Sequence, residues 1–367
     1  MKNLILLGAG HAHVHVLSTL AAQPLPGVQI TLVAPYPRQL YSGMVPGFIA
    51  GHYTLEDCVI PLEPLLKNTG IRWLSRSVTA LDADTRSLTL DDGSTLAYDW
   101  LSINTGAVHD RQKMEAQMPG AREHGLFVRP LEPFAALWPR VAELAQNRAL
   151  RVAVIGAGAA GIELAMAMAH RLPGSSLTLI SGDAPVAARY PQGVQQRVRQ
   201  ALKQRHITVL NERVVGLQAG EVLLANGARL VCDVPVIAIG GQAPAWLADS
   251  GLALDEHGFM AVDACLRATR HAEVFAVGEV STRVDQPLAR SGVYAVRAGP
   301  ALLKNLTAVV AGAEPSPHLP PKNTLNLLSC GNHEAIASWG DYSAQGRWVW
   351  WLKDWIDRRF MQRYRKA

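Results

Sequence analysis

The amino-acid sequence predicts an α/β fold that contains two strand-turn-helix units of one pattern and ends in an amphipathic helix. The first unit starts at the apolar run Leu4–Leu7 and the second at Arg151–Ile155, and each run leads into closely spaced glycines. At the C-terminus, apolar residues recur at helical spacing between positions 348 and 360. Two such units are typical of chains with two Rossmann-like domains, each of which binds a dinucleotide.

Composition places the chain among globular proteins with two or more domains, since 49% of its 367 residues are hydrophobic. Its four cysteines show neither C-x-x-C nor zinc-like spacing, which favours a reducing compartment and argues against a cysteine-pair redox centre. The stretch from Asn3 to Pro37 lacks charged residues, but glycines, histidines and prolines interrupt it. We therefore expect neither a membrane span nor a signal peptide there.

Positive charge is concentrated at the C-terminus. Residues 347–367 contain seven basic and two acidic residues, which account for the whole net charge of +5. The rest of the chain is neutral, and this argues against a body that binds nucleic acid.

The first unit departs from the full Gly-x-Gly-x-x-Gly pattern. Gly8 and Gly10 occupy the first two glycine positions, and His13 occupies the third, so the helix must separate slightly from the strand or enter at another angle. His11, His13 and His15 do not share one helix face, and we therefore expect no metal site. A position near a phosphate is favoured for His11, and a buried, hydrogen-bonded histidine is the alternative.

The second predicted strand, Val28–Val33, ends at Ala34 and Pro35, where an acidic residue usually holds a ribose hydroxyl. Because none is present, the adenosine must be held by backbone and by the loop of residues 36–47. This loop is rich in glycine and proline but contains apolar and aromatic residues. It is predicted to line a cofactor, and an ordinary surface turn is the alternative.

Short strand-like runs follow at Ile71–Leu74, Ser77–Leu81 and Ser87–Leu90, with a hairpin turn at 91–94. The next run, from Trp100 to Gly106, is predicted to be a buried strand that ends in glycine, where backbone can approach a ligand closely. Residues 111–125 are polar and fit a crossover between domains.

The second unit carries the complete glycine pattern. Gly156 permits the turn, Gly158 lets backbone amides approach a pyrophosphate, and Gly161 lets helix pack on strand. Helices are predicted over 133–147 and 192–206, with a hairpin at 226–227 and a closing strand at 234–241. The strand that ends before Ser181 again lacks an acid, and Arg189 could meet a 2′-phosphate, so NADH and NADPH both remain open.

The order of motifs, completed by residues 273–279 (Glu-Val-Phe-Ala-Val-Gly-Glu), resembles the pyridine nucleotide-disulfide oxidoreductase superfamily of FAD- and NAD(P)-dependent enzymes. Within it the chain looks most like type II NADH:quinone dehydrogenases, especially the NADH-dehydrogenase-like domain found fused to selenide, water dikinase. The segments that carry this closer likeness are 8–13, 41–47, 49–53, 262–267 and 292–297.

The resemblance implies an FAD-binding domain interrupted by an inserted NAD(P)H-binding domain. The expected parts are 1–111 (FAD domain, first part), 112–248 (NAD(P)H domain), 249–312 (FAD domain, second part) and 313–367 (C-terminal cap with the amphipathic helix). The residues expected to bind FAD or NAD(P)H are Gly8, Gly10, His11, Ala12, His13, Ala34, Pro35, Arg38, Ser42, Gly43, Met44, Val78, Asn104, Thr105, Gly106, Gly156, Gly158, Gly161, Glu163, Ser181, Gly240, Gly278 and Glu279.

The sequence departs from the family pattern at two positions. Glu279 replaces the aspartate that usually contacts the flavin ribityl chain, and Val293 stands where type II dehydrogenases have a glutamine associated with quinone binding. Glu163 is expected either to orient the nicotinamide or to serve in a helix-dipole or ion-pair role. The flavin carries the hydride chemistry in such enzymes, so the sequence nominates no catalytic acid or base.

These expectations define a flavoenzyme that transfers a hydride from NAD(P)H to FAD and electrons to a small acceptor, a quinone being favoured. The alternatives are an oxidoreductase of sulfur or selenium compounds and a membrane-docked, nucleotide-binding regulatory protein without turnover. We expect residues 347–367 to lie on the inner face of a membrane in the cytoplasm, because tryptophans and basic residues together suit the headgroup boundary. The alternative is that their apolar stripe (Trp348, Trp351, Leu352, Trp355, Ile356 and Phe360) packs on the protein body or on a homodimer partner.

Overall fold

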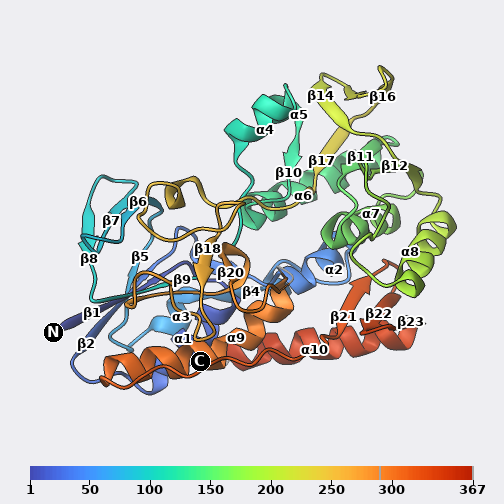
Figure 1. The fold of residues 1–367 in the computed structure, drawn as a ribbon. Helices are drawn as coiled ribbons and strands as arrows, with labels where there is room; N and C mark the ends of the chain where they lie inside the picture. The colour runs from blue at the N-terminus through green and yellow to red at the C-terminus, as the bar shows by residue number, and fades with distance from the viewer. Residues whose placement is uncertain (289–290, 366–367) are drawn as a thin grey trace.

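Two parallel five-stranded sheets organise the protein (Figure 1). The computed structural model describes residues 1–288 and 291–365. The first sheet has the order β19-β9-β1-β2-β5 and the second the order β10-β17-β11-β12-β13. Strand β19 follows the whole second sheet in the sequence, so residues on both sides of the second sheet build the first. The predicted α/β fold with two Rossmann-like units is confirmed.

The bounds of the elements are as follows. The first sheet contains β1 (Lys2–Leu7), β2 (Val28–Val33), β5 (Arg72–Leu74), β9 (Trp100–Ile103) and β19 (Val274–Ala276). The second contains β10 (Leu126–Phe127), β11 (Arg151–Ile155), β12 (Ser176–Ile180), β13 (Thr208–Leu210) and β17 (Val234–Ile237). The α-helices are α1 (His11–Ala22), α2 (Val45–Ala50), α3 (Leu62–Leu66), α4 (Arg111–Gln117), α5 (Ala121–His124), α6 (Leu131–Asn147), α7 (Ala159–Arg171), α8 (Gln192–Gln204), α9 (Gly292–Val310) and α10 (Arg347–Arg365).

Smaller sheets lie around these two. They are β3–β4 (Arg38–Leu40, Val59–Pro61), β6–β7–β8 (Val78–Asp82, Ser87–Leu90, Thr95–Ala97), β14–β15–β16 (Val214–Gln218, Glu221–Leu224, Arg229–Val231), β18–β20 (Met260–Val262, Ser281–Arg283) and β21–β22–β23 (Asn326–Ser329, Ala335–Trp339, Tyr342–Gly346). Short 3-10 helices cover Ser42–Met44, Glu56–Cys58, Ala245–Leu247 and Gly278–Val280.

Strand β1 shows why the first sheet is buried on both faces. Leu4 and Leu6 belong to the core on the side of α1 and α9, whereas Ile5 and Leu7 belong to the core on the side of β6–β8. Successive side chains of a strand point to opposite faces, so a continuous apolar run fills two cores at once. This position fixes the carboxyl end of β1, where the first glycine turn begins.

A third core joins parts of the chain that are far apart in the sequence. It includes Ile49 of α2, Met166 of α7, Leu328 of β21 and Met361 of α10. Figure 1 shows α10 running along one side of the molecule from the β21–β23 sheet toward α1. The C-terminal segment therefore packs against both units.

Only part of the apolar stripe of α10 faces the body, where Phe360 stacks on Tyr41 with 4.4 Å between ring centroids. Val349, Lys353, Asp357, Met361 and Tyr364 are buried. Three tryptophans of the predicted stripe point outward, with exposures of 56% for Trp348, 60% for Trp351 and 56% for Trp355. Although it is one of the seven basic residues of this segment, Lys353 is not a surface cation, because it forms a buried ion pair with Asp357 one turn away. Within residues 1–288 and 291–365, no helix has the length and apolarity needed to cross a membrane.

Candidate cofactor sites

Both glycine turns require glycine at their first position. Gly8 follows β1 with φ +86° and Gly156 follows β11 with φ +115°, a left-handed region that disfavours side chains. A Cβ on Gly8 would lie 2.6 Å from the carbonyl oxygen of Asn104, and one on Gly156 would lie 2.6 Å from that of Ala238. Each turn therefore passes directly against the end of the neighbouring strand. The two turns are structurally equivalent.

The N-terminus of α7 fits a pyrophosphate. Gly158 is its N-cap, without a side-chain cap and without an acidic residue in the first turn. A Cβ on Gly158 would meet no atom within 4 Å, whereas one on Gly161 would collide with the carbonyl oxygen of Gly156. Uncapped N–H groups thus face open space while the helix packs closely on the strand, which is the arrangement that anion binding needs. Gly240, after β17, likewise faces open space.

The N-terminus of α1 is partly occupied by the protein itself. The side-chain oxygen of Asn104 accepts hydrogen bonds from the N–H groups of Ala12 (3.1 Å) and His13 (3.2 Å). Its Nδ2 donates to the carbonyl oxygen of Val277 at 2.8 Å. Asn104 and Ala12, both expected to meet a cofactor, are thus joined in a cap that runs from the end of β9 to the helix.

His13 belongs to the core. It is 0% exposed; its Nδ1 donates to the carbonyl oxygen of Gly8, and its Nε2 lies 2.8 Å from the hydroxyl of Ser102. Burial lowers the pKa of His13 to about 4, so the ring is neutral. The structure corrects the expectation that the His13 side chain contacts a cofactor, because the ring fills the space between β1 and β9.

His11 points toward the loop that follows β3. Its Nε2 lies 3.4 Å from both the N–H and the hydroxyl of Ser42, and its ring meets the edge of Tyr41 with 5.2 Å between centroids. Burial, followed by the nearby Arg129, lowers the pKa of His11 to about 4. A neutral imidazole therefore lies between the first helix and this loop, beside the first glycine turn.

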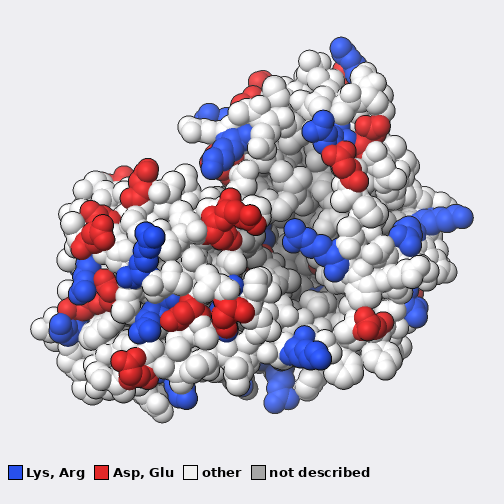
Figure 2. Space-filling model, in the orientation of Figure 1, with Lys and Arg blue, Asp and Glu red and all other residues white. Residues whose placement is uncertain are grey.

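Open space also borders the first unit near its other glycines. Gly106, after Thr105 at the end of β9, has φ +76°, and a Cβ there would meet nothing within 4 Å. Gly278 has φ +80° and lines a small cavity together with Ser281 and Tyr294. Figure 2 shows that this face of the molecule is hollowed between the part built on the first sheet and the part built on the second. The residues present therefore fit a dinucleotide at the first unit as well.

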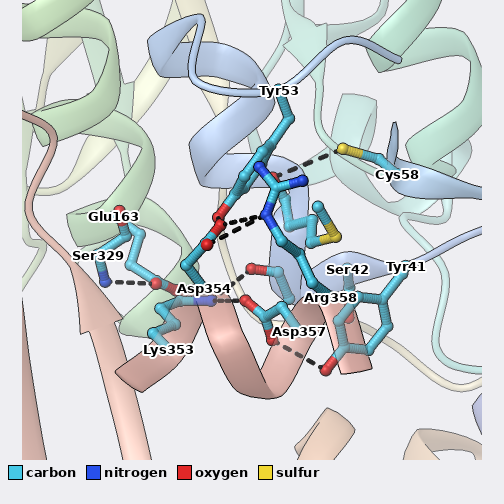
Figure 3. Close-up of polar contacts among 12 residues, drawn as sticks. Tyr41, Ser42, Tyr53, Cys58, Glu163, Ser329, Lys353, Asp354, Asp357 and Arg358 are labelled. Atoms are coloured by element: carbon cyan, nitrogen blue, oxygen red, sulfur yellow. Dashed lines mark hydrogen bonds and ion pairs between the residues drawn. The ribbon is translucent and has the colours of Figure 1, made fainter. Parts of the chain in front are cut away.

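The loop of residues 41–47 is held by helix α10 (Figure 3). Lys353 Nζ donates to the carbonyl oxygen of Gly43 at 2.6 Å and pairs with Asp357 at 2.6 Å. The hydroxyl of Tyr41 donates to the other carboxylate oxygen of Asp357 at 3.2 Å. Met44, in the same turn, is 1% exposed. The loop is an ordered element fastened to the C-terminal segment, and the alternative of a surface turn is wrong.

Glu163 lies on α7 and faces the same region (Figure 3). Its Oε1 accepts a hydrogen bond from the N–H of Ser329 at 2.7 Å. Burial raises the pKa of Glu163 to about 7, against the opposing effect of Lys353. Burial alone would lower the pKa of Lys353, but Asp357 and then Glu163 raise it above its ordinary value. Lys353 thus stays positively charged, and Glu163 beside it carries a carboxyl group with a pKa near neutral pH.

Two ion pairs join the halves of the molecule. Arg129, just before α6, pairs with Glu279 at 2.7 Å, and Arg38 of β3 pairs with Glu132 of α6 at 2.6 Å. Glu279 and Arg38 were both expected to bind a cofactor, and in the structure each pairs with a residue of the opposite half. Both bridges are only partly exposed and connect residues of the two units.

Three further residues that were expected to bind a cofactor contact nearby parts of their own unit. The carbonyl oxygens of Ala34 and Pro35 accept from Trp73 Nε1 (3.0 Å) and Ser75 Oγ (3.1 Å). Val78 begins β6 and packs on the core beneath it. These positions lie at the carboxyl end of β2 and in the adjoining small sheet.

A cavity of about 200 Å³ lies beside the second glycine turn. Its lining includes Gly156, Ser181, Glu212 and Arg213. Arg189, which the sequence suggested for a 2′-phosphate, is exposed and is not among the lining residues. Roles for Arg213, Lys353 and Asp357 at these sites were not predicted from the sequence. For Arg213 a signal existed in the expected order of parallel strands, because the residues after β13 must lie beside those after β12.

Comparison with known proteins agrees with this architecture. The pyridine nucleotide-disulphide oxidoreductase family matches residues 2–299. An NADH dehydrogenase-like protein of Mycobacterium tuberculosis is 29% identical over 241 residues, which are 62% of this chain and 59% of that protein. The demethylphylloquinone reductase NdbB of Synechocystis is 25% identical over 262 residues, or 68% of this chain and 64% of that protein. The chain thus spans about three fifths of the length of these relatives.

Solved structures share the fold. The sulfide:quinone oxidoreductase of Aquifex aeolicus has a TM-score of 0.81 at 18% identity, covering 100% of this chain and 92% of that one. NDH2 of Plasmodium falciparum in complex with NADH has a TM-score of 0.82 at 13% identity, covering 100% of this chain and 97% of that one. At these identities the likeness establishes the fold alone.

Proposed function

The chain belongs to the pyridine nucleotide-disulphide oxidoreductase family, and from this premise we propose that it is an FAD-dependent NAD(P)H dehydrogenase. The family implies FAD and NAD(P)H as its cofactors. The observation that carries the proposal is the pair of equivalent turns at Gly8 and Gly156, each at the carboxyl end of the central strand of its own parallel sheet. Ligands of open α/β sheets bind at such strand ends.

The chain supplies position and electrostatics in this proposal. When bound, FAD accepts the hydride and passes on electrons. Gly8, Gly106 and Gly278 would hold FAD, and the first turn of α7, beginning at Gly158, would hold the pyrophosphate of NAD(P)H. The loop of residues 41–47 would line the flavin.

Glu163 and Lys353 provide the charged groups beside that loop. Lys353 keeps a positive charge because its neighbours raise its pKa, and its Nζ fixes the carbonyl oxygen of Gly43. With a pKa of about 7, Glu163 can hold or release a proton at its carboxyl group under neutral conditions. We propose that Glu163 orients the nicotinamide or exchanges a proton there.

For the electron acceptor, a quinone is the compound class we propose. NdbB, a relative, is named a demethylphylloquinone reductase, and a structural neighbour is named a sulfide:quinone oxidoreductase. Chemistry through a thiol is less well supported, because all four cysteines are free and burial raises the pKa of Cys58 and Cys330 to about 12. The test is to reduce the flavin anaerobically with NAD(P)H and then to mix it with a short-chain quinone, sulfide-derived polysulfide or selenite. Rapid reoxidation by the quinone supports the proposal, and reoxidation by the sulfur or selenium compound alone contradicts it.

The non-enzymatic alternative has an optical test. A regulatory protein without turnover would not need a bound flavin. Purified protein that shows no flavin absorbance, and gains none after incubation with FAD, would contradict the enzymatic proposal.

Helix α10 supports attachment to a membrane surface, which we propose as its second role. Trp348, Trp351 and Trp355 are exposed on a helix whose opposite face is buried, and the neighbouring hairpin exposes Trp339 and Tyr342 as well. Aromatic rings combined with cations suit the headgroup region of an anionic bilayer, where each basic residue contributes about 1 kcal/mol. The proposed location is the cytoplasmic, inner face of a membrane. A second copy of the chain in a homodimer is the competing occupant of this face.

A further inference from the structure

We propose that the second cofactor site selects NADPH over NADH, with Arg213 as the residue that recognises the 2′-phosphate. The inference rests on the proposed function, because it concerns the adenosine end of the same NAD(P)H site. It follows from the charges at the carboxyl ends of β12 and β13.

The ribose position is fixed by the glycine turn. With the pyrophosphate on the first turn of α7, the 2′ position of the adenosine ribose falls at the end of the next strand, about 20 residues further on. That residue is Ser181, which follows β12 and lines the cavity. Its hydroxyl donates to Asn211 Oδ1 at 2.9 Å. NADH-selective sites place a carboxylate here to bind the 2′-hydroxyl, and a neutral side chain removes both that bond and the repulsion of a phosphate.

Arg213 reaches the same place from the neighbouring strand. Strands β12 and β13 are parallel with Ile180 opposite Leu210, so residues 211–213 run beside residues 181–183. Arg213 lines the cavity, and its Nε lies 3.7 Å from Asp183. The side chains of this pair are 64% and 83% exposed, so the bridge contributes little and is readily exchanged. A phosphate offers more charge and accepts two parallel hydrogen bonds from a guanidinium.

The carboxylate of Glu212, which also lines this cavity, is held by a neighbouring turn. Its Oε1 accepts a hydrogen bond from Asn226 Nδ2 at 3.1 Å, in the turn between β15 and β16. Glu212 and Arg213 are consecutive, and their side chains reach different partners. Of these two side chains, that of Arg213 is therefore the one that contacts the loop after β12, at Asp183.

The experiment compares binding of 2′,5′-ADP and 5′-ADP to the flavin-loaded protein by calorimetry. We expect 2′,5′-ADP to bind at least about tenfold more tightly, because a hydrogen bond to a charged group contributes about 1.5–3 kcal/mol. Arg213→Ala should abolish the difference, and Arg213→Lys should restore part of it. Arg229→Ala is the matched control: Arg229 is an exposed arginine paired with Glu221 and lies outside the cavity lining. Ser181→Glu should reverse the preference and lower kcat/KM for NADPH relative to NADH.

The possible results distinguish a wrong assignment of Arg213 from the absence of a nicotinamide-cofactor site. Equal binding of the two nucleotides by the unaltered protein, or a preference that survives Arg213→Ala, would overturn the assignment of Arg213 while leaving a nicotinamide site in place. Binding of neither nucleotide would overturn the site itself. If Arg213→Ala raises KM for NADPH alone and leaves kcat for NADH unchanged, the result supports recognition of the phosphate by Arg213.

Discussion

Lys353 Nζ donates a hydrogen bond of 2.6 Å to the carbonyl oxygen of Gly43, a residue 310 positions earlier in the chain. This bond joins the C-terminal helix to the loop that we assign to the flavin. On the same helix, Asp357 compensates the buried charge of Lys353 and also accepts from Tyr41. The face of α10 opposite to the exposed tryptophans therefore fixes the loop that we propose lines the flavin.

Replacing Lys353 by methionine should destabilise the protein by about 3–5 kcal/mol, because it leaves Asp357 buried without its cation. The measurement is equilibrium unfolding, together with the fraction of flavin retained after dialysis. The double variant Lys353→Met/Asp357→Leu should regain much of the lost stability. Arg359→Met, which alters an exposed cation of the same helix, is the control. A single variant as stable as the unaltered protein would refute a structural role for the pair.

Introducing the missing third glycine of the pattern at position 13 should destabilise the protein. His13→Gly removes the partner of Ser102 and of the Gly8 carbonyl group and leaves a cavity, so we expect a loss of about 2–4 kcal/mol in the free energy of unfolding. His13→Ala separates this effect from the cost of glycine in a helix, about 1 kcal/mol. Urea unfolding of the three proteins gives the comparison. Unchanged stability of His13→Gly would show that the ring is dispensable to the first unit.

Low pH should destabilise the protein at the contact between His52, which follows α2, His170 of α7 and His333 of the C-terminal segment. The ring of His52 stacks on that of His333 with centroids 3.9 Å apart and lies 5.3 Å from that of His170; within the described chain, neither ring nitrogen of His52 has a hydrogen-bond partner. Burial, followed by His333 and His170, lowers the pKa of His52 to about 4 against the opposing effect of Asp354.

The lowered pKa of His52 makes the protein less stable in acid. The unfolded chain binds the proton near pH 6.5, so the stability contributed by neutral His52 is complete above that pH and is lost as the pH falls toward 4. The measurement is Tm between pH 7.5 and 4.5. His52→Phe should show a smaller fall than the unaltered protein, and His257→Phe, at an exposed site, the same fall. Equal falls in all three proteins would exclude His52 as the source.

Exchanging Trp348, Trp351 and Trp355 for serine should weaken binding to anionic liposomes at least about tenfold while leaving flavin content unchanged, because these rings lie outside the core. Cosedimentation at low and high salt measures the effect. Leu319→Ser, at an apolar residue that is 86% exposed outside α10, is the control. If the triple variant sediments with liposomes like the unaltered protein, the membrane proposal fails. A dimer that dissociates in the triple variant would assign the face to a second copy of the chain.

The sequence predicted the two glycine turns and their sheets because these depend on local pattern: apolar runs, φ-positive glycines and spacing. The burial of Lys353 could not be predicted in this way. The sequence pattern of a lysine and an aspartate four residues apart on a helix predicts an ion pair in solvent. Only the packing of α10 on the loop of residues 41–47 shows that this pair is buried. The role of His13 could not be predicted for a related reason, since His13 lies on α1 and its partner Ser102 lies on β9, 89 residues later. Arg213 becomes recognisable only once β13 is known to lie beside β12.

The central claim is that the second glycine turn holds the nicotinamide cofactor that reduces a flavin held by the first. Its most direct test is anaerobic stopped-flow reduction of the bound flavin by NADPH and NADH in Gly158→Val, with Ala149→Val, at an exposed position before β11, as the control. A side chain at Gly158 would enter the open space that the pyrophosphate requires. We predict that Gly158→Val retains FAD but that its flavin is reduced at least about a hundredfold more slowly at subsaturating cofactor, equivalent to about 2.7 kcal/mol. Reduction of Gly158→Val as fast as that of the unaltered protein would contradict the account.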